Sequence, residues 1–291
     1  MQHRRIRPLI VAIALTIGVT ATGRRDLETQ DDRPPPSAVT RPVADDLQRI
    51  EGGIVRGPLA TRRLALVFTG HEFAEGASTI LDTLARHRAR ASFFLTGAFL
   101  RNTDHAAIVR RMVRDGHYVG PHSDGHLLYC PWQGPKVTLV SHDTFTADLE
   151  RNYEALAAFG ITRRAARLFL PPYEWYNTEI VEWSKAQGVT LICHTPGTRS
   201  TADYTEEGTP QFVSSATIFD SIVTREREDP HGLNGFILLL HIGAGPRRTD
   251  KFHLRFDGLV NLLAKRGYDF MGIDTLLEGA HELRGLPSSR R

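Results

Sequence analysis

Seven short apolar segments alternate with amphipathic segments along this chain, and this alternation constrains the fold more than any other sequence feature. Glycine, proline or charged residues bound the apolar segments, as is typical of buried parallel strands. The predicted strands are residues 64–68, 91–95, 118–120, 168–170, 190–193, 236–240 and 268–272. Each is too short for a buried helix, so we interpret them as strands of one sheet.

The segments between the strands place apolar residues at helical spacing. In residues 78–87, for example, Ile80, Leu81 and Leu84 share one face. The predicted helices are residues 78–87, 104–115, 143–159, 177–187, 214–226 and 254–265. About seven β/α units predict an α/β fold of one domain, a distorted (β/α)7-type barrel. A doubly wound open sheet is the alternative.

The N-terminal part of the chain lacks this alternation. Residues 1–23 combine three arginines, an apolar run at residues 9–19 and small residues up to Gly23. These are the parts of a signal peptide, and an uncleaved N-terminal membrane anchor is the alternative, since no clean cleavage site follows. Residues 24–47 are polar and proline-rich and predict a disordered linker. The folded domain is then expected at residues 48–285, facing the periplasm or the cell exterior.

Composition excludes several classes of protein. The 36 Lys and Arg and the 33 Asp and Glu give a formal net charge of +3. Because the basic residues are scattered, no nucleic-acid partner is expected. Cys130 and Cys193 are too few for a disulfide scaffold. They are either two free thiols or, in an oxidising compartment, one pair.

Titratable residues gather directly after the predicted strands. In chain order they are His71, Glu72, His122, His126, Glu174, His194 and His241. In β/α barrels the carboxyl ends of the strands form the active-site face, so we expect these residues at one rim. His122 and His126 can bind one ion if their segment coils tightly, and neutral imidazole suits zinc, cobalt or nickel. His194 is expected to be structural.

These residues fall in motifs that resemble those of the polysaccharide deacetylase family, carbohydrate esterase family 4, also called the NodB homology domain. The family has the motifs T-F-D-D, H-[ST]-x-x-H, R-x-P-[YW] and L-x-H in this order. They correspond to residues 67–70, 122–126, 170–173 and 239–241. The resemblance extends from about Leu64 to Asp274.

The resemblance implies a metal-dependent hydrolase that removes acetyl groups from an N-acetylated, or O-acetylated, cell-envelope or extracellular polysaccharide. In this family, two histidines and an aspartate hold a divalent metal, a second aspartate is the base and the L-x-H histidine is the acid. By correspondence, His122 and His126 are metal ligands, His241 is the acid and Tyr173 supplies a backbone donor. The expected metal is zinc, with cobalt or nickel as alternatives.

This chain departs from the family at three positions. Thr69 and Gly70 stand where the family has its two aspartates, and Leu170 stands at the arginine that orients the base. We therefore expect His71 or Glu72 as the third ligand, and Glu72 or Glu174 as the base. The alternative is a catalytically impaired, carbohydrate-binding pseudoenzyme of the same fold. A hydrolase of another amide or ester is a third hypothesis, from fold analogy alone.

Other polar and aromatic residues lie near the motifs. Asp124 is expected to orient a metal-binding histidine. The family also has an aspartate before the tryptophan that follows its fifth strand, and Asp203 is the acid nearest to that position. Asp203, Tyr173 and Trp175 are expected to bind substrate. The aromatic residues Tyr129, Trp132, Trp175 and Tyr176 either stack on sugar rings or pack against the fold. Arg247 and Arg248 are expected in a solvated loop, and contact with an anionic polymer is the alternative.

Overall fold

The structure is a computed structural model and describes residues 46–278. The predicted signal or anchor, nearly all of the predicted linker and residues 279–285 lie outside the described residues. A hairpin of β1 (Gln48–Ile50) and β2 (Gly53–Arg56), which the apolar pattern did not reveal, begins the domain. Within residues 46–278, no helix is long and apolar enough to cross a membrane.

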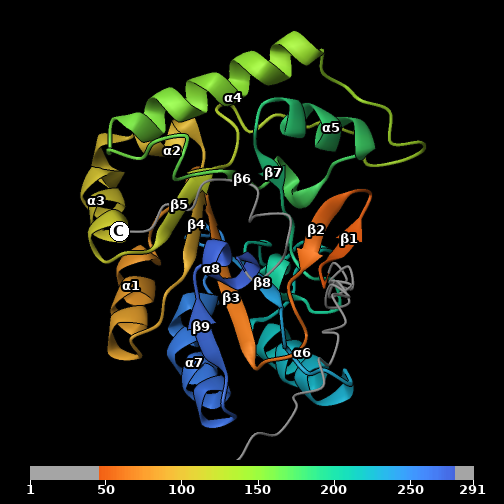
Figure 1. Cartoon of the computed structure of the whole chain (residues 1–291). Coiled ribbons are helices and arrows are strands. Elements are labelled where there is room, and N and C mark those ends of the chain that lie inside the picture. The colour runs from red at the N-terminus through yellow and green to blue at the C-terminus, as the bar shows by residue number, and fades with distance from the viewer. Residues whose placement is uncertain (1–45, 279–291) are drawn as a thin grey trace, which may run out of the picture. The chain divides into compact units, whose positions relative to one another are not determined.

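A parallel five-stranded sheet forms the centre of the domain (Figure 1). Its order is β5 (Tyr118–Pro121), β4 (Ser92–Leu95), β3 (Arg63–Gly70) and β8 (Ile237–His241), and β9 (Asp269–Met271) pairs with the first half of β3. A second parallel pair consists of β6 (Leu168–Phe169) and β7 (Thr190–Leu191). Each of the seven predicted strands is therefore present.

The second strand pair bridges the two edges of the central sheet. On one side, the Leu170 amide donates to the Pro121 carbonyl at 3.3 Å, beside β5. On the other, the Thr195 amide donates to the Ile237 carbonyl of β8 at 3.0 Å. The strands thus form a closed but irregular ring. This is the distorted barrel that the sequence predicted, and the open-sheet alternative is wrong.

The predicted helices are present with ends shifted by one to a few residues. They are α1 (Ala77–Arg86), α3 (Ala106–Arg114), α4 (His142–Ala157), α5 (Thr178–Ala186), α6 (Ser215–Glu228) and α7 (Phe256–Lys265). Side chains of Ser141, Asn177 and Ser214 cap α4, α5 and α6 by accepting backbone N–H groups, which explains where these helices begin. The short helices α2 (Gly97–Arg101) and α8 (Ile273–Leu277) span too few residues to show a helical period. Single 3-10 turns occur at Thr103–His105, Pro172–Glu174, Ser200–Ala202 and Phe252–Leu254.

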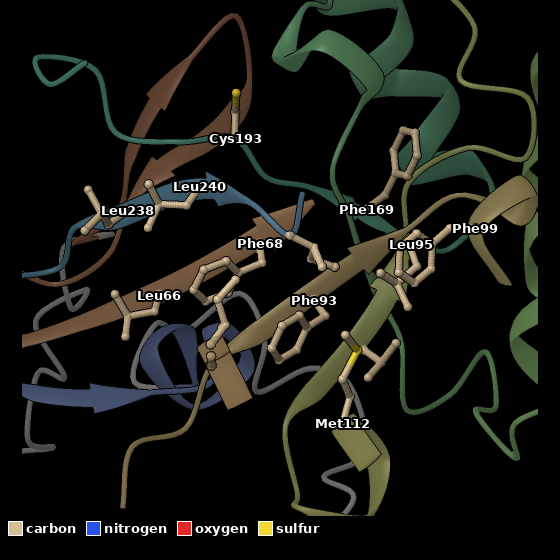
Figure 2. Close-up of a cluster of buried hydrophobic side chains, with 14 of the residues drawn as sticks. Leu66, Phe68, Phe93, Leu95, Phe99, Met112, Phe169, Cys193, Leu238 and Leu240 are labelled. Atoms are coloured by element: carbon tan, nitrogen blue, oxygen red, sulfur yellow. The ribbon is translucent and has the colours of Figure 1, made fainter. Parts of the chain in front are cut away.

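Successive residues of the central strands face two different cores. Leu66 and Phe68 of β3 belong to the larger core with Phe93, Leu95, Leu238 and Leu240 of the neighbouring strands (Figure 2). Ala65, Val67 and Leu239 point the other way, into the barrel, where α8 contributes Leu276 and Leu277. Since side chains alternate along a strand, Thr69 and His241 continue the interior rows. They pair in register at the carboxyl ends of β3 and β8 and so come to the barrel mouth.

Candidate active site

A cavity of about 500 Å³ opens at the carboxyl ends of the strands. Eight of the ten predicted site residues line it, namely His71, Glu72, His122, His126, Tyr173, Glu174, Trp175 and His241. His194, Trp132 and Tyr204 also line it. Segments far apart in the chain therefore meet at one rim, as the positions after the strands predicted.

His122 and His126 are neutral imidazoles at the bottom of this cavity. His122 is almost fully buried, and its Nδ1 donates to the Leu170 carbonyl at 2.7 Å, which leaves the Nε2 lone pair available. The two rings lie 5.2 Å apart between centroids. Burial, with repulsion from neighbouring histidines, lowers the pKa of His122 to about 3 and that of His126 to about 2. Both rings thus keep the unprotonated nitrogen that a metal needs.

The segment that carries these two histidines coils because a helix behind it binds its backbone. Ser123 and His126 have φ values of 69° and 55°, so the segment turns without forming a helix. Buried Asp148 of α4 accepts from the Ser123 hydroxyl at 2.6 Å and from the next two backbone amides at 2.8 and 2.9 Å. Asn152, one turn later, accepts the His122 amide at 2.9 Å. We did not predict these two positioning residues, although polar residues four apart on the buried face of α4 were a usable signal.

His71 lies beside His122 and His126, but its ring is not oriented to bind the same ion. Its ring is stacked on that of His126 at 4.4 Å and 12°, and its Nδ1 lies 3.1 Å from the Thr96 hydroxyl. Lone pairs of imidazole lie in the ring plane, so two parallel rings do not aim at one ion. In the part of the chain that the structure describes, no group of three His, Cys, Asp or Glu side chains is arranged to hold a metal ion.

The two positions that lack the family's aspartates differ in where they face. Thr69 lines the cavity, and its buried hydroxyl has no hydrogen-bond partner. A Cβ at Gly70 would instead lie 2.8 Å from Ile242 Cδ1 and 2.9 Å from Leu95 Cδ2, in the apolar core. Apolar side chains therefore pack closely around Gly70 and leave no space for a carboxylate there, whereas a side chain at position 69 still faces the cavity.

His241 is held by Asp203, which corrects the prediction that Asp203 binds substrate. One carboxylate oxygen of Asp203 lies 2.6 Å from His241 Nδ1, and the other accepts the His241 amide at 2.9 Å. Asp203 is buried, so neither oxygen is presented to a sugar. Burial lowers the pKa of His241, but Asp203 and Glu174 more than offset this, and the net shift is upward. His241 Nε2 is then the nitrogen left to exchange a proton in the cavity.

Arg248 fixes the loop that carries Asp203, and this corrects the expectation that Arg248 is solvated. The guanidinium is fully buried and donates to the carbonyls of Thr205, Val213 and Asp250 at 2.8, 2.9 and 2.7 Å. Arg247, in contrast, is exposed and pairs with Glu206 at 2.6 Å. The buried cation thus braces both sides of the Asp203 segment.

Glu174 enters the cavity from a strained turn. It follows Tyr173 in the 3-10 turn Pro172–Glu174, and the two residues have φ values of 54° and 59°. For residues other than glycine, this left-handed conformation costs about 1–3 kcal/mol each. Desolvation, partly opposed by His241, raises the pKa of Glu174 to about 7. Glu72 is exposed at the rim. The Glu174 carboxyl can therefore exchange a proton near neutral pH, as a catalytic base must.

Aromatic rings form one wall of the cavity. The Tyr173 ring lies 4.3 Å from that of His126 and is 41% exposed. Trp175 lines the cavity, but its Nε1 donates to the Pro131 carbonyl at 3.1 Å and the Lys136 ammonium lies 3.7 Å from its ring centroid. Trp175 is therefore largely committed to packing within the wall.

Asp124 does not have its predicted role. Its carboxylate accepts from Arg101 at 2.6 Å and Arg151 at 3.3 Å, whereas the partner of His122 Nδ1 is a backbone carbonyl. His194 lines the cavity, and burial lowers its pKa to about 4, so it is neutral. Cys130 and Cys193 are buried free thiols.

The chain is similar in sequence to known deacetylases. It matches the family described as polysaccharide deacetylase over residues 57–192. It is 28% identical to the peptidoglycan-N-acetylglucosamine deacetylase PgdA of Listeria monocytogenes over 121 residues. The aligned residues are 42% of this chain and 23% of that protein. It is 25% identical over 185 residues to a chitooligosaccharide deacetylase of Rhizobium leguminosarum bv. trifolii, covering 64% and 74%. An uncharacterised 30.6 kDa protein of Geobacillus stearothermophilus is 32% identical over 99 residues, 34% of either chain. The chain thus spans well under half the length of the first of these relatives.

Solved structures share the fold. The Bc1960 peptidoglycan N-acetylglucosamine deacetylase superposes with a TM-score of 0.60 at 21% identity, covering 77% of this chain and 92% of that one. BA3943 of Bacillus anthracis, described as a pseudoenzyme of carbohydrate esterase family 4, superposes with a TM-score of 0.59 at 21% identity, covering 79% and 70%. The family match over residues 57–192, the deacetylase relatives and the shared fold all agree with the polysaccharide deacetylase family, carbohydrate esterase family 4.

Proposed function

We propose that this chain is a metal-dependent hydrolase that removes acetyl groups from an N-acetylated cell-envelope or extracellular polysaccharide. One observation carries the proposal. Two neutral histidines, an Asp203–His241 pair and a glutamate with a pKa of about 7 surround one cavity. The site therefore offers metal-binding nitrogens, an acid and a base at one rim, although the usual aspartates are absent.

The donor chemistry of the site suits zinc, with cobalt or nickel as alternatives. His122 and His126 would supply two neutral nitrogens, and His71 or Glu72 would supply the third ligand. His71 and Glu72 are both exposed, and a turn of either side chain toward the pair would complete the set of ligands. When bound, the ion would polarise the acetyl carbonyl and the attacking water.

The chain's own residues would move the protons. Glu174, ionised above its pKa, would accept the proton of the attacking water. His241, protonated and held by Asp203, would donate from Nε2 to the leaving nitrogen. The Tyr173 amide would stabilise the tetrahedral intermediate. Glu174 lies near enough to His241 for each to shift the pKa of the other, so the base and the acid act in one site.

The substrate class and the location follow from the relatives and from the N-terminal sequence. The relatives are described as deacetylases of peptidoglycan and of chitooligosaccharides, so an acetylated amino-sugar polymer is the proposed substrate. The signal-like residues 1–23 support export, with the domain in the periplasm, outside the cell or anchored to the inner membrane.

A carbohydrate-binding pseudoenzyme is the second candidate, and two observations favour it. Within the described residues, no three side chains form a preformed metal site. The structural neighbour BA3943 is itself described as a pseudoenzyme of the family. In this candidate, the cavity would bind the glycan without releasing acetate.

Acetate release by the full chain separates the two candidates. The substrates are peptidoglycan fragments, acetylated chitooligosaccharides and acetylated xylan, offered after chelation and again after adding zinc, cobalt or nickel. The hydrolase proposal predicts release that chelation abolishes and metal restores. His122→Ala should abolish release and zinc binding, whereas His142→Ala, at an exposed histidine of α4, should change neither. Release that survives chelation, or zinc binding that survives His122→Ala, would contradict the metal assignment.

A further inference from the structure

The loop between β5 and α4 presents a tryptophan to the edge of the cavity. Trp132 is 59% exposed, and it lines the cavity. Val137 and Leu139 of the same loop are also exposed, at 58% and 52%, but they lie outside the cavity lining. An aromatic ring at the edge of a cavity that also holds several polar groups is typical of a ligand-binding surface.

The Trp132 ring is held in place by other aromatic rings. It is stacked on Trp175 at 6.1 Å and 26°, and Tyr173 meets it edge-on at 5.4 Å. Trp175 is fixed from behind by Lys136, whose ammonium also pairs with Glu51 at 2.9 Å. A ring held in this way loses little conformational freedom when a ligand binds, which favours binding.

The wall is continuous with the histidines at the bottom of the cavity. Tyr173 contacts His126 on one side and Trp132 on the other, at 4.3 and 5.4 Å between ring centroids. Tyr173 lies between Trp132 and His126, so one ligand can contact Trp132, Tyr173 and His126 in turn. The occupant must combine an apolar face with a polar edge, because the ring face is apolar and the cavity beside it is lined with histidine and glutamate. A pyranose ring has this character, since its C–H groups form faces and its hydroxyls lie around the edge.

We propose that Trp132 forms an accessory subsite that binds a second pyranose of the same glycan, next to the sugar at the histidines. The choice of a glycan rests on the proposed function, in either its hydrolase or its pseudoenzyme form. The subsite makes binding depend on glycan length: a monosaccharide reaches only the histidines, whereas an oligosaccharide also covers Trp132.

The test measures binding, so that it does not depend on turnover. Isothermal titration calorimetry on the chelated full chain compares N-acetylglucosamine, chitobiose and chitotetraose. Trp132→Ala should weaken chitotetraose binding about tenfold and leave N-acetylglucosamine unchanged. Trp132→Phe should retain most of the affinity. Leu139→Ala, on the same loop but outside the cavity, is the matched control and should bind like the unaltered chain.

The outcomes separate this inference from the proposed function. Equal chitotetraose affinity of Trp132→Ala and the unaltered chain overturns the subsite, and so does an unaltered chain that binds no oligosaccharide. Trp132-dependent binding without any acetate release supports the subsite and contradicts only the hydrolase. Circular dichroism of Trp132→Ala verifies that the loss of affinity is not a loss of fold.

Discussion

Glu174→Gln should stabilise the fold at alkaline pH and have little effect at acidic pH. The pKa of Glu174 rises from 4.5 to about 7 on folding because the carboxyl is desolvated. At about 1.36 kcal/mol for each pH unit, ionised Glu174 costs the folded state about 3 kcal/mol. Below pH 4.5 the carboxyl is protonated in both states, and no cost arises. Between about pH 4.5 and 7 the unfolded state loses its proton first, so stability falls, and above pH 7 the full cost is present.

Urea unfolding of the chelated protein between pH 4 and 8 measures this difference. Glu174→Gln removes the ionisable group at position 174. Its stability advantage over the unaltered chain should therefore grow from near zero at pH 4 to about 3 kcal/mol at pH 8. Glu72→Gln is the control, because Glu72 is exposed at the same rim. This control should not reproduce the growing advantage of Glu174→Gln. An advantage of Glu174→Gln that is constant across the range would show that Glu174 is not desolvated, and its role as a base would lose its physical support.

Four further substitutions test the supporting structure. Gly70→Ala should destabilise the fold by about 1–3 kcal/mol, because the new methyl meets apolar side chains at 2.8–3.0 Å. Residue 69 faces the cavity, so Thr69→Asp should still fold cooperatively. Urea unfolding of both variants tests these predictions. Asp148→Ala leaves the Ser123 hydroxyl and two backbone amides without an acceptor. It should cost about 3 kcal/mol and weaken zinc binding tenfold or more in a chelator competition; unchanged zinc affinity would contradict a positioning role. Arg248→Met should speed amide hydrogen exchange at residues 199–214 and leave exchange in α1 unchanged. If the substitution changes the exchange rates of the two segments equally, Arg248 does not brace the Asp203 loop.

The strands and the rim were predictable because they depend on local patterns. Buried parallel strands produce short apolar runs, and the barrel geometry then fixes where the following residues lie. This is why His122, His126 and His241 were correctly placed at one cavity. The β1–β2 hairpin was missed because it is short and only half apolar.

The partners of the site residues were not predictable, because they depend on contacts between distant segments. Asp203 meets His241 across 38 residues, and Asp148 meets Ser123 across 25. Asp124 lies between two predicted ligands in sequence, yet its carboxylate pairs with two arginines and not with a histidine. Local spacing identified which groups carry chemistry, whereas the tertiary structure decides which of them hold one another.

The most direct test of the central claim is the rate of acetate release by the zinc-loaded chain, measured beside Glu174→Gln and Glu72→Gln on the same substrate. If Glu174 has taken over as base, the unaltered chain releases acetate and Glu174→Gln is at least about 100-fold slower with its zinc content unchanged. Glu72→Gln separates the two candidate third ligands: it keeps its zinc and a rate close to the unaltered one if His71 holds the metal, and loses zinc if Glu72 does. A Glu174→Gln variant that retains the full rate would contradict the account of the base. An unaltered chain that binds zinc and releases no acetate from any of the glycans would contradict the hydrolase itself.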